Sequence, residues 1–67
     1  MLEVEVNSMQ KTQVRFTTKT MVYHKDFDSY EEAENNANEL LSLGVYNGEE
    51  ILNIGIVSQQ HGIKMVK

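Results

Sequence analysis

The chain has 67 residues, a formal net charge of −4 and no cysteine. This length suits one small domain, the absence of cysteine excludes disulfides and cysteine-based zinc sites, and no run of about 18 apolar residues is long enough to span a membrane. Acidic residues stand near the N-terminus, where a secretion signal is basic, so we expect a cytoplasmic protein. A domain this small has a small core and is often stabilised by association, which makes a homodimer the first expectation.

The N-terminal part of the chain predicts two strands. Leu2, Val4 and Val6 alternate with polar residues, which is the period of a half-buried strand. Residues 12–24 are rich in β-branched side chains, and these favour one long strand over a helix. A bulge near Thr17–Thr20 is an alternative that would exchange the two faces of its second half. Without the bulge, one face carries Val14, Phe16, Thr18, Thr20 and Val22, and the other carries Arg15, Thr17, Lys19, Met21 and Tyr23.

Residues 28–44 predict the only helix. Ser29 and Glu32 form the spacing of a capping box, with Asp28 as an alternative cap, and acidic residues crowd the first turns. Gly44 suits a left-handed C-terminal cap. The apolar residues recur every three or four positions and form one narrow stripe: Tyr30, Ala33, Ala37, Leu40 and Leu41. Because the middle of this stripe is alanine, we expect the helix to lie close against a sheet.

Two further strands are predicted after the helix. Asn47-Gly48 is a turn pair that adopts positive φ at low cost. Residues 51–57 are almost continuously apolar, which is typical of a strand covered on both faces, and Gly55 within them indicates a bulge or a close approach by another backbone. Residues 58–62 predict a turn, and residues 63–66 a short last strand.

The predicted order is strand, strand, helix, strand, strand, which gives a two-layer α+β domain with one helix on a mainly antiparallel four-stranded sheet. The commonest arrangement places the first and last strands in parallel at the centre, as in the β-grasp fold. The alternative pairs the long second strand with residues 51–57 and leaves the short strands at the edges. In either case we expect the helix to cover Leu2, Val4, Val6, Val14, Phe16, Leu52, Ile54 and Ile56.

One helix covers one face of such a sheet, and the other face is left for a partner. We expect this face to carry Met21, Tyr23, Ile51 and Val57, with Met9 or Met65 beside them. A contiguous exposed apolar patch marks an interaction site, and methionine and tyrosine suit such a surface. The hypothesis is therefore a protein interface, used first for self-association and then for a host or regulatory protein.

Chemical motifs are weak in this sequence. His24 and His61 lack the recurring spacing of a metal site, no serine stands in a nucleophile motif, and no glycine-rich phosphate loop occurs, so we expect neither an enzyme nor a cofactor. Arg15, Lys19 and Lys25 on one strand face are the alternative, a nucleic-acid contact, which a pI near 5.0 disfavours. A further alternative is that the acidic helix imitates a phosphate backbone.

The prediction from sequence is therefore a non-enzymatic protein-binding module, an adaptor or inhibitor of a partner protein. In its short length and its lack of Cys, Pro and Trp, the chain is similar to small phage or mobile-element proteins that bind a host factor.

Overall fold

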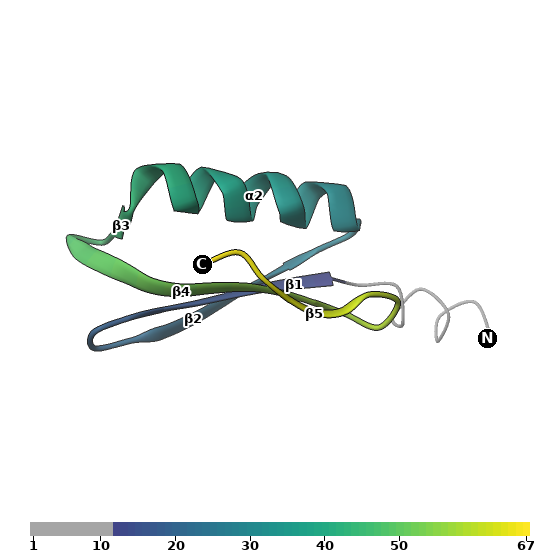
Figure 1. Cartoon of the computed structure of the whole chain (residues 1–67), viewed down its shortest axis with the longest axis horizontal. Coiled ribbons are helices and arrows are strands. Elements are labelled where there is room, and N and C mark those ends of the chain that lie inside the picture. Colours follow the sequence, from purple (N-terminus) through teal and green to yellow (C-terminus); the bar gives the residue numbers. More distant parts are fainter. Residues whose placement is uncertain (1–11) are drawn as a thin grey trace.

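One helix packs against an antiparallel, curled sheet in the computed structural model, which describes residues 12–67 (Figure 1). The elements in chain order are β1 (Thr12–Thr18), β2 (Val22–Phe27), α2 (Tyr30–Leu43), β3 (Val45–Tyr46), β4 (Glu49–Ser58) and β5 (Gly62–Met65). The predicted ββαββ class is confirmed. The strand expected at Leu2, Val4 and Val6 lies outside the described residues. No helix within residues 12–67 is long and apolar enough to cross a membrane.

The first hairpin differs from the prediction, because residues 12–24 do not form one long strand. The chain reverses between Thr18 and Met21, and the two halves pair as β1 and β2. The amide of Thr18 donates to the carbonyl of Met21 (2.9 Å), and the amide of Met21 donates to the hydroxyl of Thr18 (3.2 Å). A threonine side chain therefore closes this turn in the way that a main-chain carbonyl usually does.

The ends of α2 are those that the sequence predicts. The Ser29 hydroxyl accepts a hydrogen bond from the amide of Glu32 at 3.2 Å, which satisfies one of the free donors of the first turn. At the other end, Gly44 adopts a left-handed conformation with φ of 74°, and its amide donates to the carbonyl of Leu40. Ala33, Ala37 and Leu40 are buried and face the sheet as expected, whereas Leu41, which was expected in the same stripe, is 43% exposed.

The centre of the sheet is the antiparallel pair of β1 and β4, with β2 on the outer side of β1. On its other side, β4 pairs with β3 near its start and with β5 near its end. This is the alternative in which the short strands lie at the edges. The β-grasp-like arrangement, with a parallel central pair, is not the one observed among the described strands.

A bulge in β4 decides which of its residues enter the core. Thr17 pairs with Asn53 but Thr18 pairs with Ile51, so Leu52 is an extra residue in the ladder. Ile51 therefore shares a face with Ile54 and Ile56, and all three are 0% exposed. The expectation that Ile51 faces away from the helix is wrong, and so is the expectation that the helix covers Leu52, which is 45% exposed.

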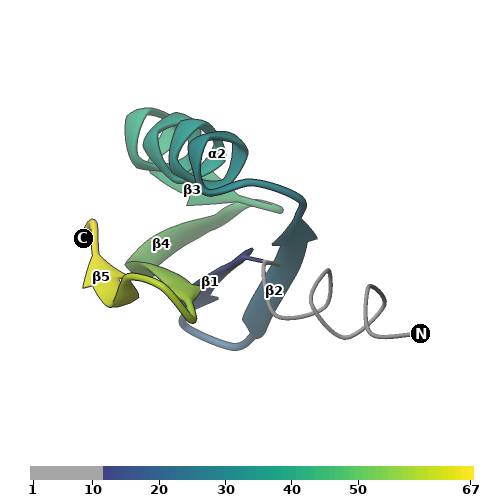
Figure 2. The same ribbon diagram turned by 90° about the vertical axis from the view of Figure 1, so that its right-hand side faces the viewer.

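The apolar core lies between α2 and one face of the sheet. Its buried members are Val14, Phe16, Ala33, Ala37, Leu40, Ile51, Ile54 and Ile56. Figure 2 shows α2 on one side of the sheet, with none of the described elements on the opposite side. We call that opposite side the uncovered face.

Candidate binding surface

The register of the strands determines which residues form the uncovered face. Since side chains alternate along a strand and paired residues point the same way, two rows cross the sheet from β2 to β5. The first row is His24, Arg15, Gly55 and Met65. The second row is Asp26, Gln13, Val57 and Ile63. Val22, Thr17 and Asn53 continue the face toward the bulge, and the Asn53 amide donates to the Thr17 hydroxyl at 3.3 Å.

The half of the uncovered face over β4 and β5 is an apolar groove, made by Gly55, Val57, Ile63 and Met65. Its volume is about 220 Å³, and Arg15, Phe16, Thr17 and Asn53 complete its lining. Ile63 is 70% exposed and Met65 is 57% exposed, although both are large apolar side chains. Because Gly55 has no side chain, Met65 packs over it, with its sulfur 3.1 Å from the place that a Cβ of residue 55 would take.

The half over β1 and β2 carries Val22, which is 68% exposed, and a bonded set of polar side chains, Gln13, Arg15 and Asp26. The Arg15 guanidinium donates from Nε to Oε1 of Gln13, and the Gln13 amide donates to Oδ1 of Asp26 at 2.9 Å. One cation and one anion are thus linked through a neutral amide. The two formal charges cancel, and Arg15 is the charged residue that lines the groove.

The four residues expected at the interface are not gathered on one surface. Val57 lines the apolar groove. Met21 is 52% exposed but lies in the turn between β1 and β2, and Ile51 is buried. Tyr23 points to the helix side, where its ring packs against Phe16 and Tyr46 at centroid distances of 5.0 and 4.7 Å. The reversal at Thr18–Met21 moves Tyr23 to that side, since it changes the face of every residue after the turn.

The sequence pattern does not predict two of the residues that dominate the groove, Ile63 and Met65, as its main members. The sequence pattern predicts only a short last strand at Ile63 and places Met65 only beside the expected patch. The signal for them is the alternation of apolar and polar residues in the sequence Ile63-Lys64-Met65. Within this run, Lys64 turns to the helix side and forms an exposed ion pair with Glu34 at 3.3 Å.

The basic residues expected to form a nucleic-acid contact also lie apart. Arg15 is on the uncovered face, and Lys19 is in the exposed turn between β1 and β2. Lys25 pairs with Val14 and therefore points to the helix side, where its ammonium lies 5.7 Å from the centre of the Tyr46 ring. Three cations on three different surfaces do not form a stripe that follows a nucleic-acid backbone.

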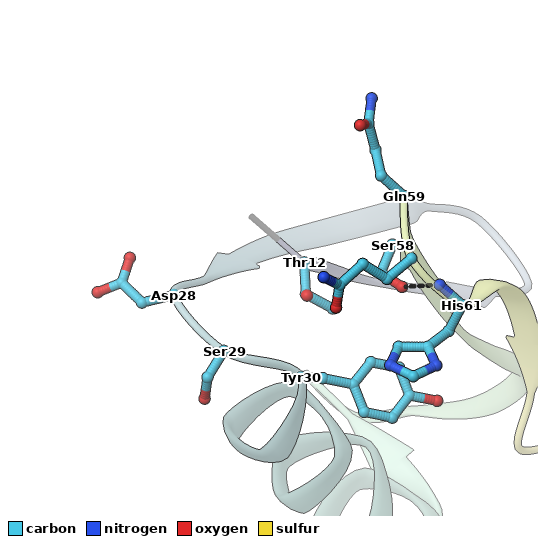
Figure 3. Close-up of a pocket in the computed structure, with 8 residues that line it drawn as sticks. Thr12, Asp28, Ser29, Tyr30, Ser58, Gln59 and His61 are labelled. Atoms are coloured by element: carbon cyan, nitrogen blue, oxygen red, sulfur yellow. Dashed lines mark hydrogen bonds between the residues drawn. The ribbon is translucent and has the colours of Figure 1, made fainter. Parts of the chain in front are cut away.

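A second hollow of about 300 Å³ lies at the start of α2. Figure 3 shows the Tyr30 and His61 rings lying against each other, with a centroid distance of 4.3 Å, while Asp28 points away. The Ser58 hydroxyl accepts a hydrogen bond from the main-chain amide of His61 at 3.0 Å, which orders the turn between β4 and β5. The Ser29 hydroxyl is likewise used by the helix cap. These contacts give both serine hydroxyls a structural role.

Comparisons of the chain with protein-family models, with curated proteins and with solved structures found no match.

Proposed function

We propose that this chain is a protein-binding module, an adaptor or inhibitor, that binds its partner through the uncovered face. The observation that supports the proposal is the apolar groove, whose rim carries two large and mostly exposed side chains on the side opposite the helix. Single exposed apolar residues are ordinary on protein surfaces, but a contiguous apolar patch with polar residues around it is typical of an interaction site.

The arrangement of the face supports binding to a protein surface. The groove supplies an apolar centre, while Gln13, Arg15 and Asp26 supply a polar border at one side. Protein interfaces have the same division into an apolar centre, which excludes water, and a polar rim, which determines orientation. Met65 adds adaptability, because an unbranched thioether changes shape to fit a partner.

The experiment compares two variants of equal chemistry on different surfaces. Ile63→Lys places a charge in the groove, and Leu43→Lys places the same charge on α2, where Leu43 is 61% exposed. Immobilised wild-type chain and both variants are incubated with an extract of the native cell, and the captured proteins are identified by mass spectrometry. We expect Ile63→Lys to lose the specific partner and Leu43→Lys to keep it. Equal capture by all three chains would contradict a binding role for the uncovered face.

A further inference from the structure

We propose that Asn47 is a site of spontaneous covalent modification, in which its side chain closes a ring onto the main chain at Gly48 and loses ammonia. The amide nitrogen of Gly48 attacks Cγ of Asn47, a new C–N bond forms, and the bond from Cγ to the side-chain nitrogen breaks. The proton of the Gly48 amide leaves with that nitrogen as ammonia, and a succinimide ring remains. Water then opens the ring at one of its two carbonyls, which leaves either aspartate or isoaspartate at position 47.

The turn between β3 and β4 presents the reacting groups to water. Asn47 and Gly48 are the central residues of the turn that the Tyr46–Glu49 pair closes, and both are exposed. No hydrogen bond from the Gly48 amide is found within residues 12–67. A Cβ at position 48 would meet nothing within 4 Å, so the space around the attacking nitrogen is open. The attacking nitrogen is therefore neither shielded by a side chain nor held by a main-chain carbonyl.

The other asparagines of the described chain lack this combination. Three of them lie within α2: Asn35, Asn36 and Asn38. The amide that follows each of these three donates to a carbonyl of the helix. Asn53 precedes Ile54, which is 0% exposed in β4 and has a branched side chain. Asn47 is the one asparagine of the sequence that a glycine follows, and glycine adds no side chain to obstruct the attack.

The two products have different effects on the turn. Aspartate keeps the main chain and adds a carboxylate beside Glu49, which already accepts hydrogen bonds from two threonine hydroxyls. Isoaspartate carries the main chain through the former side chain, so the turn becomes longer by one backbone atom. Because a tight turn fixes the register of its hairpin, the longer turn does not fit the Tyr46–Glu49 pair. Tyr46 then leaves the rings of Phe16 and Tyr23, whose centroids lie 4.9 and 4.7 Å from its own.

The test incubates the purified full chain at physiological temperature, in mildly alkaline and in mildly acidic buffer. Cleavage after glutamate separates residues 40–49, which contain Asn47, from residues 51–67, which contain Asn53. We expect the mass of fragment 40–49 to increase by the exchange of one amide for one acid, with isoaspartate as a separate chromatographic peak. The increase should be faster in the alkaline buffer, because the attacking amide must lose its proton. We expect fragment 51–67 to convert at least about tenfold more slowly, since its amide meets water only on local opening.

Asn47→Gly is the matched control, because it removes the side-chain amide and keeps a residue that accepts the positive φ of 53°. Asn47→Asp carries the new carboxylate from the start and separates the effect of charge from that of the longer main chain. We expect the purified isoaspartyl form to melt about 4 °C or more below fresh wild type. Incubated Asn47→Gly should keep its midpoint. A fragment 40–49 of unchanged mass, or one that converts no faster than fragment 51–67, overturns the proposal. An isoaspartyl form that melts with fresh wild type overturns the loss of the Tyr46–Glu49 pair.

Discussion

The carboxylate of Glu49 accepts a hydrogen bond from the hydroxyl of Thr18, with 2.7 Å between the two oxygens. The hydroxyl of Thr20 donates to the same carboxylate at 2.8 Å. Glu49 begins β4, Thr18 ends β1 and Thr20 lies in the β1–β2 turn, so this contact joins the two turns at one end of the sheet. The hydrogen bonds from Thr18 and then Thr20 lower the pKa of the Glu49 carboxyl below its ordinary value.

The first prediction concerns pH. Since the pKa of Glu49 is lower in the folded chain than in the unfolded chain, the stabilisation is fully present above the unfolded pKa. It is lost as the pH falls through the folded pKa. We expect the thermal midpoint of Glu49→Gln to lie below that of wild type at neutral pH and to converge with it in acid. Glu50→Gln controls for the change in net charge. A difference that stays constant across the pH series would contradict the role of the ionised carboxylate.

The second prediction concerns Gly55. A Cβ at this position would lie 3.1 Å from the sulfur of Met65, and the backbone φ is one that alanine accepts. Met65 ends in a flexible thioether, so we expect Gly55→Ala to change the free energy of unfolding by less than about 1 kcal/mol. The added methyl displaces Met65 within the groove, and we expect weaker capture of the partner from the cell extract.

Gly62→Ala is the matched control for Gly55→Ala. Gly62 has a φ of 71° and is the first residue of β5, so alanine there strains the backbone without entering the groove. We expect a loss of about 1 kcal/mol of stability and no effect on capture of the partner. A loss above about 2 kcal/mol for Gly55→Ala would show that Met65 cannot move aside.

The third prediction concerns the start of the helix. Ser29→Ala removes the hydroxyl that accepts from the amide of Glu32, and we expect a loss of about 1 kcal/mol. In a domain of this size that lowers the thermal midpoint by roughly 4–8 °C. Ser42→Ala, at an exposed helical position near the other end, should leave the midpoint unchanged or raise it slightly. Equal midpoints for the two variants would show that the cap contributes nothing.

The fourth prediction tests the bulge in β4. Ile51 is 0% exposed and Leu52 is 45% exposed, although they are neighbours of similar size. We expect Ile51→Val to cost about 1 kcal/mol and Ile51→Ala about 3 kcal/mol, while Leu52→Ala changes the free energy of unfolding by about 0.5 kcal/mol or less. Denaturant unfolding measures all three. The reverse ranking would mean that β4 has the regular alternation first expected from its sequence.

The helix was predictable because its signals are local. Ser29, Glu32 and Gly44 act within one turn of their own positions, and the spacing of Ala33, Ala37 and Leu40 needs no knowledge of the sheet. The turn at Asn47 and Gly48 is confirmed for the same reason, since both residues adopt positive φ of 53° and 84°.

The reversal between Thr18 and Met21 was not predictable by the same rules. Tight hairpins usually need glycine or asparagine to adopt positive φ, and this turn has neither. It is stabilised by the Thr18 hydroxyl and by Glu49, which is far away in the sequence. The faces assigned to Tyr23 and Lys25 were therefore wrong, and the candidate surface came from the paired register and not from the pattern of one strand.

The bulge in β4 was not predictable either, because it also depends on residues that are far away in the sequence. An almost continuously apolar run from Ile51 to Ile56 is compatible with either face, and only the pairing with Thr17 and Thr18 determines which residues enter the core. The sequence indicated an irregularity at Gly55, where the structure has a close approach by Met65, while the extra residue is Leu52.

The position of β4 beside β1 has a consequence for folding kinetics. Thr12 pairs with Ser58, so the central ladder joins β1 to β4, two strands that β2, α2 and β3 separate in the sequence. The hairpin and the helix form from nearby residues, whereas this ladder requires closure of the long intervening loop. The rate-limiting barrier should therefore contain β1 and β4 already paired, and this chain should fold more slowly than a helical bundle of equal length.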